Sequence, residues 1–454
     1  MLRSANPVNN QTITTYEEHT PEETREIIEL AAAAQAQWAG SAFSDRRHLM
    51  EKAASVLRQH SEQYARMITL EMGKPIKQSV AEVEKCAGVC AYYADHAESF
   101  LSNEAVPTGA SRSYIAYRPL GVILAVMPWN FPFWQVFRFA APALMAGNAA
   151  LLKHASNVTG SALMIASVFI EAGFPEHLFS VLKIPGKKVA QVIEDPHVQA
   201  ATLTGSVGAG RAVAAKAGES LKKTVLELGG SDPYIILEDA NLEQAIRTCA
   251  NSRLINSGQS CIAAKRFIVA KPLLKAFEEG LVREMASKVM GDPMDRATDV
   301  GPQASIDLRD ELHTQVMRSI EKGARCLLGG EVPEREGAWY PPSILTNVKP
   351  GMPAWDEELF GPVAAITGAA DEAEAIRKAN DSVFGLGAAV FTSDTSRGQR
   401  IAEYGLNAGC CFVNEQVQSD PRLPFGGIGQ SGYGRELSEV GIREFTNIKT
   451  VYVK

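Results

Sequence analysis

One cysteine of this sequence has the surroundings of a nucleophile. Cys261 ends the polar, glycine-containing segment Asn256–Cys261, which lies between a predicted helix at 242–254 and a predicted strand at 267–269. A thiol on such a bend can face a cleft, where cations or backbone N–H groups lower its pKa from about 8.5. Most cysteines of a soluble chain are small buried hydrophobes, so Cys261 is a candidate only together with its predicted neighbours.

A carboxylate and an amide are the two further groups that thiol chemistry would use. Glu227 ends a predicted strand just before the glycine pair 229–230. Its carboxylate is expected to project into a cleft, where it could activate a water or deprotonate a thiol. Asn130 lies among rigid aromatic and proline residues, and its side-chain N–H would suit the oxyanion formed when a thiolate adds to a carbonyl. The alternatives are a solvated strand end for Glu227 and an ordinary turn for Asn130.

Several glycine-rich loops follow predicted strands. The segment 205–210 begins a predicted helix whose free N–H groups could face a phosphate. Its spacing does not match Gly-x-Gly-x-x-Gly, so the motif is weak by itself. The loops 357–362 and 424–427 are similar, and their number indicates backbone that approaches a ligand closely.

Short apolar runs alternate with helical segments through most of the chain. In the first series we expect strands at 122–127, 149–153, 178–183, 200–203 and 224–228, with helices at 159–172, 187–194 and 208–221. A second series runs from 233 to 413. Alternation of this kind predicts an α/β fold of two doubly wound lobes, whose ligands lie beyond the carboxyl ends of the strands. The runs 113–117 and 449–453 are predicted to be exposed strands, which invite pairing with another chain.

Composition excludes several classes of protein. The chain has 454 residues, 46% of them hydrophobic and 21% charged, as in a soluble protein of two or three domains. A net charge of -7 argues against nucleic-acid binding, and no apolar stretch is long enough for a membrane span. Seven scattered cysteines do not form a disulfide framework, which favours the cytoplasm. Cys86 and Cys90 lack further ligands nearby, so we predict no metal site.

Taken together, these segments make the sequence resemble the aldehyde dehydrogenase superfamily over essentially its whole length. The matching pieces occur in the family's order, and they are 128–132, 153–156, 205–206, 227–230, 258–261, 358–362 and 424–427. The resemblance implies an NAD(P)-binding domain at 1–106 and 119–228, a catalytic domain at 229–436 and oligomerisation strands at 107–118 and 437–454. It also implies a homodimer or homotetramer.

The resemblance further implies a division of labour among the site residues. Cys261 would attack the aldehyde to give a thiohemiacetal, Asn130 would stabilise its oxygen, and Glu227 would activate the water that hydrolyses the later thioester. NAD or NADP would be the cofactor. The residues implied to bind it are Trp129, Lys153, His154, Ala155, Ser156, Gly205, Ser206, Val207, Leu228, Glu358 and Phe360. Many NAD-preferring members resemble one another in having glutamate where this chain has Ser156, so we expect NADP to bind as well.

The expected substrate is an aldehyde with a distal carboxylate. Arg138 lies eight residues after Asn130, where succinate-semialdehyde dehydrogenases are similar in having an arginine that binds this carboxylate. Ser419 and Arg422 could complete the carboxylate site. The alternative for Arg138 is an ion pair with an internal carboxylate. An arginine that some members carry six residues before the cysteine is Ile255 here.

Three alternatives to succinate semialdehyde oxidation remain at this point. The substrate could be glutarate semialdehyde or a general aliphatic aldehyde. The acyl group could pass to coenzyme A, although Glu227 speaks against this because such an enzyme needs no base for water. A non-catalytic protein of the same fold is the third alternative, and the joint presence of Cys261, Glu227 and Asn130 makes it the weakest.

Overall fold

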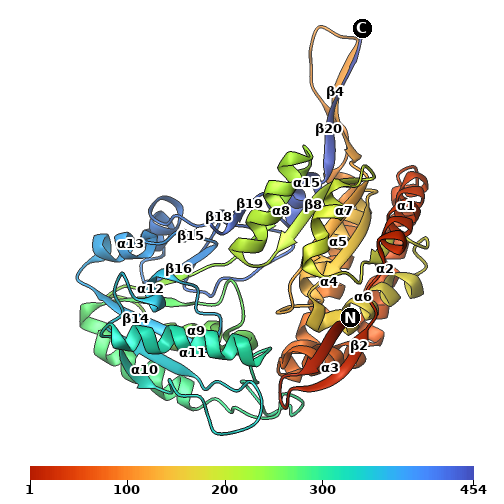
Figure 1. Cartoon of the computed structure of the whole chain (residues 1–454). Helices are drawn as coiled ribbons and strands as arrows, with labels where there is room; N and C mark the ends of the chain where they lie inside the picture. Colours follow the sequence, from red (N-terminus) through yellow and green to blue (C-terminus); the bar gives the residue numbers. More distant parts are fainter.

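The computed structural model describes residues 1–454 and consists of two α/β lobes and a projecting arm (Figure 1). The first lobe is built on a six-stranded sheet with the order β19-β9-β8-β5-β6-β7. Its strands are β5 (Val122–Met127), β6 (Ala149–His154), β7 (Phe179–Val181), β8 (Val198–Thr204), β9 (Lys223–Glu227) and β19 (Gly432–Tyr433). All neighbours except β19 and β9 run parallel, which confirms the predicted doubly wound sheet.

The second lobe contains a seven-stranded sheet with the order β12-β13-β14-β11-β10-β16-β17. Its strands are β10 (Pro233–Ile236), β11 (Arg266–Ala270), β12 (Arg325–Leu328), β13 (Ser343–Thr346), β14 (Val363–Ala369), β16 (Gly387–Phe391) and β17 (Cys410–Val413). Only β12 is antiparallel to its neighbour. Its helices are α9 (Leu242–Leu254), α10 (Leu274–Ala286), α11 (Ile306–Glu321), α12 (Pro353–Asp356), α13 (Glu372–Asn380) and α14 (Thr395–Arg400). The predicted elements of the second α/β lobe are therefore confirmed, whereas α11, β12, β13 and α12 were not predicted.

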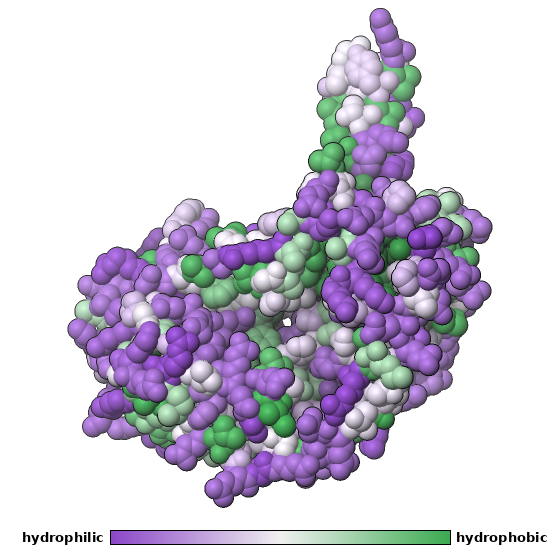
Figure 2. All heavy atoms as spheres, in the orientation of Figure 1, coloured by the Kyte–Doolittle hydropathy of each residue, from purple (hydrophilic) through white to green (hydrophobic).

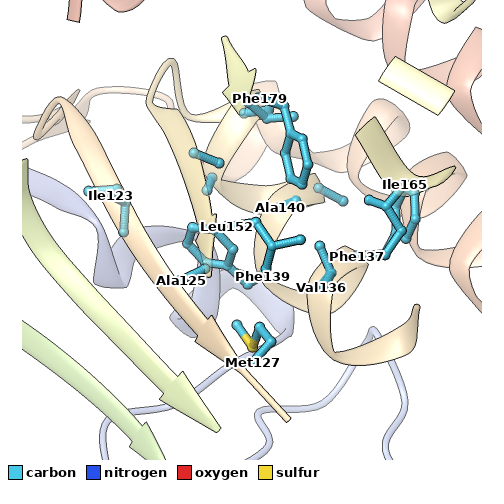
Figure 3. Packing of buried hydrophobic residues seen from close by; sticks show 14 of the residues in the cluster. Ile123, Ala125, Met127, Val136, Phe137, Phe139, Ala140, Leu152, Ile165 and Phe179 are labelled. Atoms are coloured by element: carbon cyan, nitrogen blue, oxygen red, sulfur yellow. The ribbon is translucent and has the colours of Figure 1, made fainter. Parts of the chain in front are cut away.

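Helices cover the first sheet and bury its core. They are α1 (Pro21–Trp38), α2 (Phe43–Gln59), α3 (Ser61–Met72), α4 (Ile76–Phe100), α5 (Trp134–Met145), α6 (Thr159–Ala172), α7 (Val189–Glu194), α8 (Val207–Glu219) and α15 (Ser438–Glu444). Figure 3 shows Met127 of β5 near Phe139 and Val136 of α5. Every residue of α5 is buried, as expected for a helix enclosed on all sides, and Arg138 is therefore buried with it.

Strands outside the two large sheets form three small ones. A hairpin that the polar sequence of residues 1–20 did not indicate joins β1 (Leu2–Asn6) to β2 (Gln11–Tyr16). A two-stranded pair consists of β15 (Phe384–Gly385) and β18 (Ile428–Gly429). The arm consists of β3 (Glu104–Ala105), β4 (Arg112–Pro119) and β20 (Thr446–Val453), with β4 between the other two. No helix of the molecule has the length and apolar character that crossing a membrane requires.

The chain returns to the first lobe earlier than the expected domain boundaries imply. Strand β19, within the segment assigned to the catalytic domain, pairs with β9 of the first sheet. Helix α15 then lies against α4, and the arm strand begins only at Thr446. Residues of both ends of the chain therefore complete the first lobe.

A buried ion pair connects α4 to the loop that precedes α5. The ammonium of Lys74 contacts the Glu82 carboxylate, and both side chains are inaccessible to solvent. The other oxygen of Glu82 accepts hydrogen bonds from the backbone N–H groups of Phe133 and Trp134, at 2.9 and 3.0 Å. Lys74 also lies 3.8 Å from the centroid of the Phe131 ring. The loop that bears Asn130 is thus attached to a long helix.

Replacing Lys74 by methionine should destabilise the protein, because Glu82 would remain as an unpaired buried charge. We expect the Lys74→Met variant to lose roughly 3–5 kcal/mol of unfolding free energy. The matched change Lys275→Met removes an exposed pair with Glu279 and should cost less than about 1 kcal/mol. Denaturant unfolding of both variants measures the difference, and equal stabilities would contradict this account.

Candidate active site

Cys261 follows a strained turn at the end of α9. The φ angles of Asn256, Ser257 and Gly258 are 51°, 54° and 79°. All three residues are therefore in the left-handed conformation, which residues other than glycine rarely adopt. A Cβ atom at Gly258 would overlap the backbone of Gly361, so glycine is required there. The turn reverses the chain between α9 and β11 and leaves Cys261 partly accessible.

Hydrogen bonds from buried amides hold this turn in place. The Asn256 side chain donates to the carbonyl oxygens of Asn130 and Gln259, at 2.7 and 3.0 Å. The Ser257 hydroxyl accepts from the backbone N–H of Gly301 at 2.9 Å. The first contact joins the cysteine loop of the second lobe to the asparagine loop of the first. The two loops therefore keep a fixed relation, as a shared reaction centre requires.

Two cavities meet at Cys261. The larger cavity has a volume of about 550 Å³ and the smaller about 140 Å³, and Cys261 lines both. Residues lining the larger cavity include Trp129, Asn130, Gly205, Ser206, Val207, Leu228, Glu358 and Phe360. Those lining the smaller one include Lys85, Trp134, Arg138, Ile255, Ser419 and Phe425. A molecule in each cavity would approach the sulfur from a different side.

One wall of the larger cavity is the beginning of α8. Gly205 and Ser206 follow strand β8, and the Ser206 hydroxyl accepts the Ala209 N–H at 3.3 Å as the helix N-cap. The first N–H groups of a helix have no partner within it and favour anions. The rings of Trp129 and Phe360, which line the same cavity, are perpendicular, with centroids 5.7 Å apart. The cavity thus offers both N–H donors and aromatic faces.

Glu358 lines the same cavity and is held from two directions. Its Oε1 accepts the Gly230 N–H at 3.0 Å and lies 3.4 Å from the ammonium of Lys265. A Cβ atom at Gly229 would overlap the carboxylate, which explains the glycine pair after β9.

Lys265, which sequence reasoning missed, also donates to the carbonyl oxygens of Ser260 and Cys261, at 2.9 and 2.7 Å. A lysine just before a fully buried strand was the only signal for it.

The predicted residues at the end of β6 lie beside the larger cavity, outside its lining. Lys153 forms no hydrogen bond or ion pair, and burial lowers the pKa of its ammonium. Ala155 and Ser156 follow it, and Ser156 is half-buried.

The neighbouring His154 has both ring nitrogens engaged: Nε2 lies 2.9 Å from the carbonyl oxygen of Pro132, and Nδ1 lies 3.0 Å from the Ala155 N–H. Burial lowers the pKa of His154 to about 4, so the ring is neutral and braces the loop.

Asn130 retains one free donor beside the cysteine. Its side-chain nitrogen donates to the Gln259 carbonyl at 3.1 Å, and its oxygen accepts from Gln135 at 3.0 Å. An amide nitrogen has two hydrogens, so the second is available to a ligand in the larger cavity. The partners on both sides fix which way the amide points.

The thiol of Cys261 is protonated in this state. Burial raises its pKa to about 12, although the cations Arg138 and Lys265 act in the opposite direction. Glu227 is close enough to influence this pKa but lines neither cavity. Its oxygens have no hydrogen-bond partner, and Oε1 lies next to Gly426. The carboxylate is thus buried rather than projecting into the cleft as expected, and burial raises the pKa of Glu227 well above its usual value.

Arg138 forms the internal ion pair that was the alternative interpretation of this residue. Its guanidinium contacts the Glu436 carboxylate, and both side chains are buried. It also lies 3.3 Å from the Thr204 hydroxyl and 4.8 Å from the centroid of the Phe425 ring. Arg138 still lines the smaller cavity with Cys261. Arg138 therefore forms the internal ion pair and is also positioned to contact a ligand in the smaller cavity.

Of the two residues expected to assist Arg138, only Ser419 reaches the cavity. Ser419 is buried, and its hydroxyl accepts a hydrogen bond from the Lys85 ammonium at 2.7 Å. Arg422 is exposed and pairs with Asp420 two residues away, so the expectation that it completes the site was wrong. A short local ion pair of this kind keeps the guanidinium on the surface. Cys86 and Cys90 are fully buried packing residues of α4.

The chain is similar to known proteins over its full length. Residues 1–451 match the model of the aldehyde dehydrogenase family. A probable NADP-dependent succinate-semialdehyde dehydrogenase of Synechocystis is 49% identical and covers 100% of this chain and 99% of that protein. The succinate semialdehyde dehydrogenase Sad of Escherichia coli is 47% identical and covers 99% of this chain and 97% of its own.

Among solved structures, the succinic semialdehyde dehydrogenase of Streptococcus pyogenes in complex with NADP+ has a TM-score of 0.98. It is 36% identical and covers 100% of both chains. Because the family model and the relatives extend over the whole chain, both lobes and the arm are included in the match. This chain belongs to the aldehyde dehydrogenase family.

Proposed function

We propose that the protein oxidises an aldehyde to its carboxylic acid with NAD or NADP, and that succinate semialdehyde is the substrate. The observation that supports this best is the position of Cys261 on the shared wall of two cavities. The larger cavity, of about 550 Å³, has space for the nicotinamide end of a dinucleotide, whereas the smaller one, of about 140 Å³, admits only a short molecule. A nucleophile between them contacts both reactants.

The residues of the larger cavity fit a nicotinamide dinucleotide. The free N–H groups at the start of α8 suit a pyrophosphate, and the Glu358 carboxylate suits ribose hydroxyls. Trp129, Val207, Leu228 and Phe360 supply apolar contacts. The unpaired ammonium of Lys153, near the end of β6, suits the second ribose, with His154 and Ala155 positioning the loop. Such a cofactor would accept the hydride that leaves the substrate carbon.

Ser156 favours the acceptance of NADP as well as NAD. A 2'-phosphate carries negative charge, and a carboxylate at this position would repel it. Serine is neutral and can donate a hydrogen bond instead. The Synechocystis relative is named as NADP-dependent and the Escherichia coli relative as NAD(P)-dependent, which supports this proposal.

The covalent step needs a thiolate at Cys261. Glu227 takes the thiol proton, and the sulfur then bonds to the aldehyde carbon while the carbonyl electrons move to its oxygen. The free N–H of Asn130 and the backbone N–H of Cys261 stabilise this oxyanion. Since Glu227 makes no hydrogen bond, no contact has to break when its side chain rotates toward the sulfur. Loss of the hydride leaves a thioester on Cys261.

Hydrolysis of the thioester completes the reaction. Glu227 first releases the thiol proton to solvent and then, again ionised, removes a proton from the attacking water, so that the acid and the Cys261 thiolate are released. Burial raises the pKa of Glu227, so its ionised carboxylate is a stronger base than that of an ordinary glutamate. Hydrolysis should therefore accelerate as pH rises through the raised pKa of this carboxyl group, since the ionised form is the active base.

The smaller cavity supports a substrate that ends in a carboxylate. Arg138 and Ser419 line it, and a guanidinium and a hydroxyl are suited to donating hydrogen bonds to carboxylate oxygens. Two relatives at 47% and 49% identity are named for succinate semialdehyde. Glutarate semialdehyde and uncharged aliphatic aldehydes are the alternatives that a substrate comparison must separate.

We also propose that the enzyme is cytoplasmic and assembles as a homodimer or homotetramer through the arm. All seven cysteines are free, which fits a reducing compartment. The arm exposes large apolar side chains, among them Ile448 and Tyr452 at 62% and 58% exposure. Figure 2 shows hydrophobic residues along the arm, which projects away from the two lobes. Burial against a second copy would remove this surface from water.

Substrate and cofactor can be tested together by following reduced cofactor in absorbance. We expect turnover of succinate semialdehyde with both NAD and NADP, and a higher kcat/KM than for butanal, an uncharged aldehyde of equal length. Added coenzyme A should not change the rate, because water accepts the acyl group. An absolute requirement for coenzyme A, undetectable activity with NADP, or equal kcat/KM for both aldehydes would each contradict one part of the proposal.

The role of Glu227 predicts a specific kinetic defect. Glu227→Gln keeps the size of the side chain and removes the base, so steady-state turnover should fall by about 100-fold or more. Rapid mixing tells whether a first equivalent of reduced cofactor still forms, which separates the hydrolysis role from thiol deprotonation. Glu415→Gln, an exposed glutamate of the second lobe, is the matched control. Normal turnover of the Glu227→Gln variant would exclude the assigned role.

Assembly can be measured by light scattering on the purified protein. The mass should be two or four times that of the chain, and replacement of the exposed Ile448 by lysine should shift it toward the monomer. A wild-type protein with the mass of a single chain would refute the proposed role of the arm.

A further inference from the structure

Lys85, which has no part in the proposed chemical steps, lies in the wall of the smaller cavity. Lys85 projects from α4, a helix of the first lobe, into the cavity that Cys261 also lines. Its ammonium donates to the Ser419 hydroxyl at 2.7 Å and lies 4.2 Å from the centroid of the Trp134 ring. The side chain is half-buried, so its charge is placed in the cavity rather than in bulk water.

Lys85 differs from the other charged groups of this region in having no anionic partner. Glu82, the acidic residue three positions before it, is paired with Lys74. Asp420, beside Ser419, is paired with Arg422. Arg138 is itself neutralised by Glu436. The cavity wall therefore has one uncompensated positive charge, and a partly desolvated cation of this kind favours an anion from the ligand.

The smaller cavity has an apolar residue at the position where some family members carry an arginine. Ile255 lines the smaller cavity at the position six residues before Cys261. Lys85 and Ser419 come from segments that are far apart in the sequence, and they meet at the same cavity. A carboxylate between them would accept hydrogen bonds from an ammonium and a hydroxyl. The ammonium already orients this hydroxyl, so little side-chain freedom is lost on binding.

We propose that Lys85 is a specificity-determining residue that recognises the distal carboxylate of the aldehyde. Ser419 and Arg138 donate further hydrogen bonds to the same carboxylate. This inference rests on the proposed function, because it assigns the charge recognition of that same substrate. Lys85 supplies the net positive charge, and the paired Arg138 supplies directed donors. The cavity thereby selects short aldehydes that end in an anion.

Recognition by Lys85 should depend on pH in the alkaline range. Burial, followed by the nearby Arg138, lowers the pKa of Lys85 to about 8, whereas Cys86, Glu82 and Asp420 act to raise it. The ammonium is charged below this pKa and neutral above it, so carboxylate recognition is present at pH 7 and lost as pH rises through about 8. Glu227 and Glu436 also face Arg138, and burial raises the pKa of both carboxyl groups. Because their titration also changes the charge near the cavity, a Lys85 variant is needed as a reference.

The test compares succinate semialdehyde with butanal in the wild type and in Lys85→Met, which keeps the apolar stem against Trp134. The measured quantity is the ratio of kcat/KM for the two aldehydes, in which effects on the thiol cancel. We expect Lys85→Met to lower this ratio by about 10-fold to 100-fold, mainly through KM for the charged aldehyde. Lys77→Met removes an exposed lysine of the same helix and should leave the ratio unchanged.

The same ratio measured from pH 7 to 9.5 gives a second readout that a merely structural lysine would not produce. It should fall with pH in the wild type and stay flat in Lys85→Met. An unchanged ratio in Lys85→Met, or a fall with pH as steep as that of the wild type, would overturn the assignment. A wild type that does not prefer the charged aldehyde would overturn the proposed substrate together with it, whereas a preference that survives Lys85→Met overturns only the role of Lys85.

Discussion

The ammonium of Lys265 is the interaction on which the geometry of the site depends. It binds the carbonyl oxygens of Ser260 and Cys261 and forms an ion pair with Glu358. Because the same group contacts the cysteine loop and the Glu358 carboxylate in the wall of the larger cavity, it links the positions of the Cys261 sulfur and of that carboxylate. The charge is buried, and its carbonyl and carboxylate partners offset the cost of removing it from water. Lys265 thus both fixes the position of the cysteine loop and supplies positive charge beside the Cys261 thiol.

Hydrogen bonds between the lobes also hold the cysteine loop against the loop that bears Asn130. Asn256 of the second lobe donates to the backbone of Asn130 in the first, and Glu82 attaches the following residues to α4. Helix α4 also presents Lys85 to the smaller cavity. One long helix therefore contacts the loop that bears Asn130, the proposed oxyanion donor, and also carries Lys85, the proposed recognition group for the far end of the substrate. The span between these two points is fixed by the helix rather than by flexible loops.

Sequence reasoning found the groups that lie at strand ends and missed those defined by distant partners. Glu227, Gly205 and Lys153 lie at or just after the carboxyl ends of β9, β8 and β6, and parallel strands place these ends at a common edge. Cys261 was found from the polar bend that precedes it. Lys85 had no such signal, because its partner Ser419 is 334 residues away. The ion pair of Arg138 with Glu436 was open for the same reason, and only the family resemblance suggested a substrate role. The hairpin of β1 and β2 was missed because its strands are short and largely polar.

The raised pKa of the Cys261 thiol has a consequence for the survival of the enzyme between turnovers. Peroxides and alkylating agents react with the thiolate, and a sulfur that stays protonated at neutral pH is a poor target for either. A resting molecule in an oxidising episode would keep its sulfur intact, whereas a molecule that held a permanent thiolate would progress to sulfenic and higher acids.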